Sequence, residues 1–248
     1  MTSQSTLVFI PCSTGAPWSP AQLTPYGDRP VRTMRLPDFV DDMEVYADAV
    51  ASLVSDLDSY VLVGDSFGGT IAIAFATRRP RGLQGLVVSG GFVKNPFSPV
   101  TTGALRLMGK ARGGLYRNLV LPIYVRQLAS PYDAEGQVPW SAAHTHRLFL
   151  ENTPARSFAT RLVAVTRADY TGRLNRIEVP TLILTPSQEG VVSEEAAKIM
   201  REGIPNAREI VLDRTGHMFR FSHPETYARE VKDFLAHNID RTGERDTV

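Results

Sequence analysis

Short apolar runs alternate with helical patterns along most of this 248-residue chain. The runs are bounded by proline or glycine and cover residues 6–10, 31–36, 60–64, 86–89, 181–184 and 209–212, each typical of a buried strand. Helical patterns cover 39–57, with Asp38 as the expected N-cap, 68–77, 194–201 and 224–237. Parallel neighbours need crossover connections. The alternation therefore predicts an α/β fold: a three-layer α/β/α sandwich with a mostly parallel sheet of about six strands.

The alternation stops between residues 95 and 178, where leucines recur at helical spacing without a strand pattern. We expect an inserted helical cap over 95–178 and a core domain made of 1–94 and 179–248. Residues 95–177 contain eleven lysine and arginine side chains but only four aspartate and glutamate side chains. This excess favours an anionic substrate or an acidic partner, and a solvated basic surface is the simpler alternative.

Composition argues against several classes of protein. The formal net charge is +1 with both signs interspersed, so no nucleic-acid partner is expected. The single cysteine, Cys12, excludes an internal disulfide, and no window has the roughly 18 apolar residues that span a bilayer. The first fifteen residues lack the basic start and the long apolar stretch of a secretion signal. We therefore expect a cytoplasmic protein without a membrane partner, either a monomer or a homodimer.

The stretch VLVGDSFGGTIAIAFA, residues 61–76, places Ser66 between an apolar strand and an alanine-rich helix. Gly64 and Gly68 flank the serine at the spacing Gly-x-Ser-x-Gly. A tight strand-to-helix turn strains its central residue, and neighbouring backbone can approach it only where Cβ atoms are missing. The stretch resembles the nucleophile elbow of the α/β-hydrolase family, in which the serine attacks a carbonyl carbon. The chain begins its first strand too early for the antiparallel hairpin that opens many members of this family.

The resemblance implies a base further along the chain, because a serine hydroxyl attacks an ester only when a base takes its proton. His217 follows a strand pattern in the sequence RTGHMFRF and matches the family's Gly-His loop. His223 and His237 are expected beside the following helix, while His144 and His146 fall in the expected cap. We therefore predict His217 as the base.

The family order of serine, acid and histidine implies an acid between the nucleophile and the base. The sequence TPSQEG follows the strand at 181–184 and contains Glu189, where the family more often has aspartate. Glutamate can take this role. Glu194 and Glu195 belong to the next helix, and Asp213 lies too near the histidine in sequence. We predict Glu189 as the acid, with a solvated loop residue as the alternative.

Acyl transfer also needs N–H donors for the tetrahedral oxyanion, which the family takes from the residue after the nucleophile and from an early loop. Phe67 supplies the first donor. The sequence FIPCSTG stands where the family often has His-Gly-x-x-Gly, and matching by position gives the N–H of Ser13 as the second donor, with Cys12 as the alternate. The thiol of Cys12 has no elbow context, and we interpret it as a small buried side chain.

Apolar side chains near these positions are candidates for the substrate pocket, with ordinary core packing as the alternative. They are Trp18, Phe97, Met108, Tyr124, Trp140 and Met218.

Together the residues predict a serine hydrolase that cleaves a small-molecule carboxylic ester through Ser66, His217 and Glu189, with an acyl-enzyme intermediate and no metal or organic cofactor. In the same family such triads also act on thioesters, lactones and carbon–carbon bonds or transfer acyl groups, and the sequence leaves these alternatives open. A ligand-binding or partner-docking protein that keeps only the fold is the alternative from another class.

Overall fold

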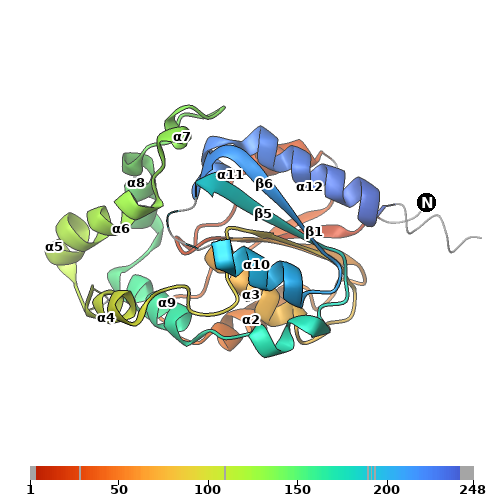
Figure 1. Ribbon diagram of the computed structural model, residues 1–248, viewed down its shortest axis with the longest axis horizontal. Helices are drawn as coiled ribbons and strands as arrows, with labels where there is room; N and C mark the ends of the chain where they lie inside the picture. The colour runs from red at the N-terminus through yellow and green to blue at the C-terminus, as the bar shows by residue number, and fades with distance from the viewer. Residues whose placement is uncertain are drawn as a thin grey trace, which may run out of the picture.

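A wholly parallel six-stranded sheet forms the centre of the protein (Figure 1). The computed structural model describes residues 4–27, 29–108, 110–188, 190, 192 and 194–240. The strand order is β2-β1-β3-β4-β5-β6. The strands are β1 (Thr6–Ile10), β2 (Val31–Thr33), β3 (Tyr60–Asp65), β4 (Leu83–Ser89), β5 (Thr181–Gln188) and β6 (Ala207–Gly216). The predicted α/β architecture is confirmed, and every neighbouring pair of strands is parallel.

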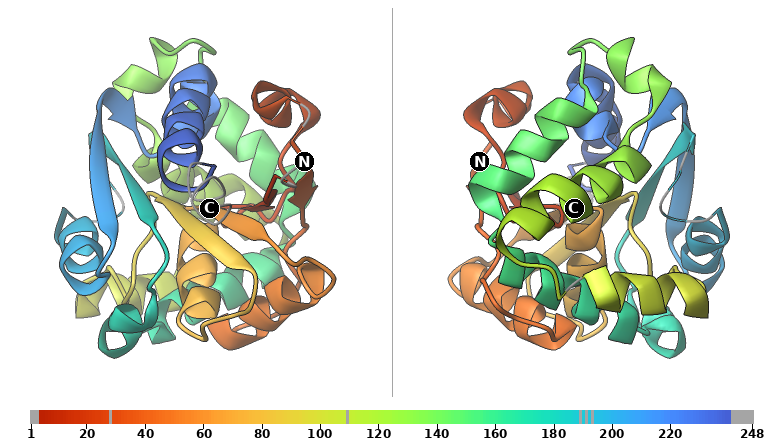
Figure 2. Two further views of the ribbon diagram at one scale, coloured as in Figure 1. Left: turned by 90° about the vertical axis from the view of Figure 1, so that its right-hand side faces the viewer. Right: turned by 90° about the vertical axis from the view of Figure 1, so that its left-hand side faces the viewer.

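Helices cover both faces of the sheet, as Figures 1 and 2 show. One face carries α2 (Met43–Leu53), α3 (Phe67–Ala76) and α10 (Glu194–Gly203), and the other carries α12 (Pro224–Asn238) with the short α1 (Pro20–Leu23) and η1 (Thr24–Tyr26). Successive residues of a strand point to opposite faces. Leu62 of β3 therefore packs in a first apolar cluster, on the face that carries α2, α3 and α10. Val61 and Val63 pack in a second apolar cluster, on the face that carries α12.

A series of helices lies between β4 and β5 in the chain, and all of them except the last, which packs against α10, sit beyond the carboxyl ends of the strands, at the left of Figure 1. They are α4 (Pro99–Met108), α5 (Gly113–Leu115), η2 (Tyr116–Val120), α6 (Leu121–Leu128), α7 (Pro131–Ala134), α8 (Ala142–Asn152), α9 (Ala155–Arg167) and η3 (Thr171–Arg176). Their inward side chains form a third apolar cluster, which includes Leu121, Phe149 and Phe158.

The helix expected over 39–57 is shorter than the sequence pattern indicates. Phe39 has a φ of +64°, which a helix does not tolerate, and the cap of α2 is Asp42, whose carboxylate accepts the N–H of Glu44 at 2.9 Å. The expectation that Asp38 caps this helix was wrong. Asp38 instead accepts a hydrogen bond from Ser157 of α9 at 2.7 Å, so its partner lies 119 positions later in the chain.

Strands β5 and β6 run further than their apolar runs, and their pairing reaches from Thr181 opposite Ala207 to Gln188 opposite Gly216. The long pairing brings the end of β5 beside Gly216, which directly precedes His217. The short helix α11 (Phe219–Ser222) follows β6 there. Among the described ranges, no helix has the length and the apolar character needed to cross a bilayer.

Candidate active site

Ser66 occupies the corner between β3 and α3 in a strained conformation, with φ of +53° and ψ of −115°. Its N–H donates to the carbonyl of Ser89 at 2.7 Å, which ties the corner to β4. A Cβ on Gly64 would lie 2.5 Å from the carbonyl oxygen of Gly68, closer than any real contact. The turn therefore requires a residue without a Cβ at this position, which explains the glycine in the sequence.

His217 follows β6 and reaches the corner from the far end of the chain. Its Nε2 lies 2.9 Å from Ser66 Oγ, although 151 positions separate the two residues. The histidine is 7% exposed. The ring is therefore largely shielded from water while its nitrogen meets the hydroxyl. Glu189, the predicted acid, lies outside the described residues.

The loop after β1 is anchored by helix α9 and the residues just before it. The carbonyl of Ser13 accepts a hydrogen bond from Nη1 of the buried Arg161 at 2.9 Å. The carbonyl of Thr14 accepts one from the hydroxyl of Thr153 at 2.7 Å. Phe67 is the first residue of α3, where backbone N–H groups have no acceptor inside the helix and the helix dipole favours negative charge. Both predicted oxyanion donors, Ser13 and Phe67, line one cavity together with Ser66.

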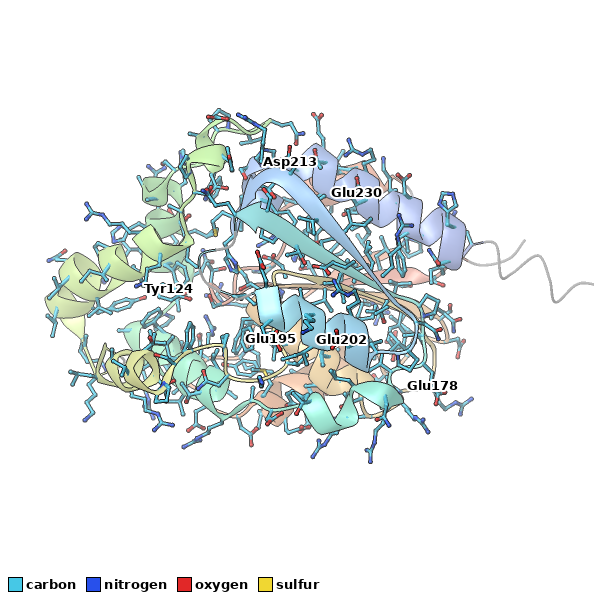
Figure 3. All side chains as sticks on the ribbon, viewed as in Figure 1. Tyr124, Glu178, Glu195, Glu202, Asp213 and Glu230 are labelled. Atoms are coloured by element: carbon cyan, nitrogen blue, oxygen red, sulfur yellow. The ribbon has the colours of Figure 1, made fainter. Side chains whose placement is uncertain are left out.

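This cavity is largely apolar, and two of the six predicted pocket residues belong to its wall. Phe97 follows β4, and Tyr124 points from α6 toward α9, where its ring lies 5.1 Å from that of Phe158 (Figure 3). Burial raises the pKa of the Tyr124 hydroxyl, so it stays neutral at physiological pH. Further apolar walls come from Phe92, Leu162 and Val165.

The other predicted pocket residues lie elsewhere or are not described. Trp18 packs against Phe9, with ring centroids 4.7 Å apart, in the core beneath the sheet face that carries α12. Trp140 stacks on Phe221 at 4.6 Å and lines a separate apolar groove between the helical segment and α1. Met218 is buried in the third apolar cluster. The side chain of Met108 lies outside the described part of the chain.

A buried carboxylate that the sequence reasoning did not select, Asp133, lies beside the histidine loop. It accepts the N–H of Ser130 and the hydroxyl of Ser222, each at 2.9 Å, and is 2% exposed. A Cβ on Gly216 would approach its Oδ2 to 3.3 Å. Burial raises the pKa of Asp133, and its two hydrogen bonds oppose that shift. The sequence signal was a capping box at Ser130, which predicts a helix start and no burial.

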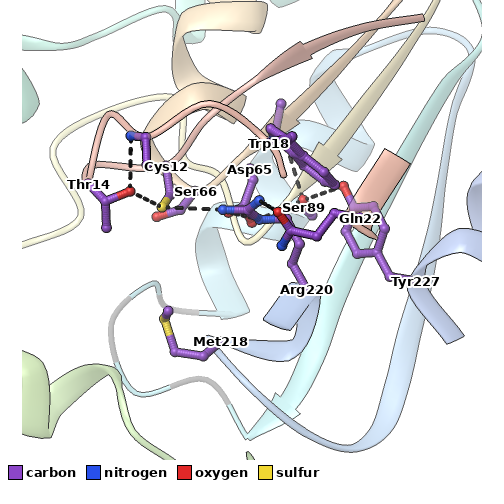
Figure 4. A network of polar contacts seen from close by, with 12 residues as sticks. Cys12, Thr14, Trp18, Gln22, Asp65, Ser66, Ser89, Met218, Arg220 and Tyr227 are labelled. Carbon is purple, nitrogen blue, oxygen red and sulfur yellow. Dashed lines mark hydrogen bonds and ion pairs between the residues drawn. The ribbon is translucent and has the colours of Figure 1, made fainter. Parts of the chain in front are cut away.

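A second unselected feature is a buried ion pair directly behind the serine (Figure 4). Nε of Arg220 donates to Oδ2 of Asp65 at 2.8 Å, and the two side chains are 3% and 6% exposed. Asp65 also lies 3.4 Å from the hydroxyl of Ser89, which in turn meets the hydroxyl of Tyr227 at 3.0 Å. From the sequence Asp65 is a residue of the turn. The one signal in the sequence for a buried ion pair was the position of Arg220 among apolar residues in MFRF.

In the described ranges, no group of three or more histidine, cysteine, aspartate or glutamate side chains is arranged to hold a metal ion. The available chemistry is that of a hydroxyl, an imidazole and backbone N–H groups at a helix start. Such an arrangement suits nucleophilic attack by an alcohol with proton transfer to a ring nitrogen.

The parallel sheet, the strained serine after its third strand and the histidine after its last strand define the α/β-hydrolase fold. Residues 27–221 match the family described as serine aminopeptidase, S33. The chain belongs to this family.

Curated relatives and solved structures agree with this placement. A 2-hydroxy-6-oxononadienedioate/2-hydroxy-6-oxononatrienedioate hydrolase of Cupriavidus pinatubonensis is 31% identical over 189 residues, which cover 73% of this chain and 63% of that protein. The match therefore spans less than two thirds of the relative's length. A pimeloyl-[acyl-carrier protein] methyl ester esterase of Neisseria meningitidis is 24% identical, over 87% of this chain and 71% of that protein. A thermophilic esterase from Thermogutta terrifontis has the same fold, with a TM-score of 0.77 at 21% identity over 95% of this chain and 90% of that one.

Proposed function

We propose that this protein hydrolyses a carboxylic ester of a small molecule, with Ser66 as the nucleophile and His217 as the base. The observation that carries the proposal is the 2.9 Å contact between Ser66 Oγ and His217 Nε2 at a strained strand-to-helix corner. A serine that only capped α3 would direct its oxygen at an N–H of the first turn, and Ser66 makes no such hydrogen bond.

The reaction follows from this geometry. Ser66 Oγ attacks the ester carbonyl carbon while its proton passes to His217 Nε2. The negative charge that develops on the carbonyl oxygen is stabilised by the N–H groups of Ser13 and Phe67. The proton on Nε2 then passes to the departing alkoxide, and the acyl group remains on Ser66. Water, deprotonated by the same nitrogen, releases the acid and restores the hydroxyl.

We assign Glu189 to orient and charge-stabilise the imidazole through its second nitrogen. Its support is positional: Gln188, one residue earlier, ends β5 opposite Gly216, which directly precedes His217. The strand that precedes Glu189 in the chain therefore ends beside the residue that precedes the proposed base. Asp133 is the competing carboxylate, because it is buried beside the same loop.

We further propose that residues 95–178 act as a cap over the serine and set the substrate. Phe97, Tyr124, Phe158 and Leu162 from this segment line the cavity at Ser66. Their apolar surfaces favour an apolar acyl group. The basic excess of the segment favours an anionic group elsewhere on the substrate.

A second candidate is hydrolysis of a carbon–carbon bond in a compound such as 2-hydroxy-6-oxononadienedioate. Its support is the name and the 31% identity of the Cupriavidus relative, whereas the methyl ester esterase of Neisseria supports ester cleavage. Comparing kcat/KM across short and long acyl esters, thioesters, lactones and the dienedioate separates these activities.

The nucleophile is tested by the mass of the intact protein after exposure to a fluorophosphonate probe. The wild type should gain one adduct and Ser66→Ala none. His217→Ala should be labelled at least about 10³-fold more slowly, because an unassisted hydroxyl is a poor nucleophile. An unlabelled wild type, under conditions that label a reference serine hydrolase, would remove the basis of the proposal.

A further inference from the structure

Arg220 of α11 follows the proposed base closely in the chain and contacts the residues that precede the proposed nucleophile and the proposed second oxyanion donor. It lies three residues after the proposed base. Its Nε donates to Asp65, which directly precedes the proposed nucleophile. Its Nη2 lies 3.6 Å from the sulfur of Cys12, which directly precedes the proposed second oxyanion donor. Figure 4 shows the guanidinium between these two partners. One buried cation thus connects three segments that meet only in the folded protein.

Two aromatic rings also lie against the guanidinium. The ring of Trp18 has its centroid 4.1 Å from the guanidinium carbon, and the ring of Phe221 has its centroid 4.0 Å away. Nη1 lies 3.3 Å from Oε1 of Gln22 in α1. Cation–π contacts at buried positions are strong, and the rigid donor fork of arginine fits several partners at once. These contacts together restrict the orientation of this side chain.

We propose that Arg220 is a positioning residue. It holds the corner at Ser66, the loop that contains Ser13 and the segment that contains His217 in their relative positions. The inference rests on the proposed function of Ser66 and His217. The ion pair sets the end of β3 against α11, and the contacts to Cys12 and Trp18 set the loop after β1 against the same helix. Since displacing reacting groups by about 1 Å costs on the order of 100-fold in rate, small errors here reach the chemistry.

Two single substitutions separate positioning from plain packing. Arg220→Lys keeps the positive charge but has one nitrogen, which cannot meet Asp65 and Cys12 while filling the space between two rings. Asp65→Asn keeps the size of its side chain and removes the charge that holds Nε. The matched control is Arg29→Lys, because Arg29 makes a two-bonded pair with Asp240 and is 10% exposed.

The measurement is the saturation kinetics of inactivation by a fluorophosphonate, which gives a maximal rate constant and a concentration for half-saturation. Each variant is measured well below its own unfolding midpoint, and its competent sites are counted from the adduct. We expect Arg220→Lys and Asp65→Asn to lower the maximal rate by on the order of 100-fold with half-saturation nearly unchanged. The control should match the wild type in both.

The outcomes are distinct. A purely structural role would lower the unfolding midpoint of both variants and leave the maximal rate per competent site unchanged, which would overturn the proposal. If Arg220→Lys fails to fold, the isosteric Asp65→Asn decides by the same criterion. A wild type that is never labelled would instead remove the proposed function on which this inference rests.

Discussion

Replacing Gly68 by alanine should disable the site through a backbone collision. A Cβ at this position would lie 2.4 Å from the carbonyl oxygen of Ile10 and 2.5 Å from that of Pro11. Ordinary contact begins at 3.4 Å, so α3 and the loop after β1 must separate by about 1 Å. Both neighbours are backbone atoms, and neither can swing aside as a side chain would.

The size of the effect follows from what moves. Pro11 lies two residues before Ser13, and Gly68 directly follows Phe67, so the collision drives apart the two proposed oxyanion donors. A displacement of about 1 Å costs on the order of 100-fold in rate, and loss of one donor costs about 100- to 1,000-fold. Overpacking a dense core also lowers the free energy of unfolding by about 1–3 kcal/mol.

The assay compares fluorophosphonate labelling and thermal unfolding of Gly68→Ala with those of Gly103→Ala. Gly103 lies in α4 with nothing within 4 Å of its would-be Cβ. Alanine there should keep the wild-type labelling rate and gain about 0.5–1 kcal/mol from helix propensity. Wild-type labelling and an unchanged midpoint for Gly68→Ala would refute the reasoning.

Further predictions concern the acids and the pocket. Glu189→Gln should lower kcat by about 10³–10⁴-fold with little change in unfolding midpoint; if it is fully active while Asp133→Asn is not, Asp133 is the acid. Burial raises the pKa of Asp133 above its unfolded value, so the native state holds the extra proton between the two pKa values. The free energy of unfolding of the wild type, relative to that of Asp133→Asn, should therefore fall as pH rises from about 4 through the raised pKa, and stay level above it. Unfolding midpoints of both proteins, measured against pH, test this; a relative gain in wild-type stability with rising pH would contradict it. Leu162→Trp narrows the cavity beside Ser66 and should lower kcat/KM for octanoyl esters at least about tenfold more than for acetyl esters, and an equal loss for both would place the acyl chain elsewhere.

The sequence determined the elements of the fold because their signals are local. The apolar runs at 60–64 and 181–184 are buried strands, and the glycines around Ser66 stand where other backbone atoms approach closely. These patterns depend on neighbours within a few residues, which the chain fixes before any tertiary contact forms. Helix ends were determined less well: the pattern over 39–57 predicted Asp38 as the cap, whereas the positive φ of Phe39 makes Asp42 the residue that caps α2.

Tertiary structure alone decided which distant residues meet. Nothing local to His217 places its nitrogen 2.9 Å from Ser66 rather than in solvent, and the register of β6 in the sheet does so. Trp18 looked available for substrate but faces the core, where it stacks on the guanidinium of Arg220. Whether a charge such as that of Asp65 is solvated or buried depends on a partner 155 positions away, because buried charges persist only where packing brings an opposite charge to them.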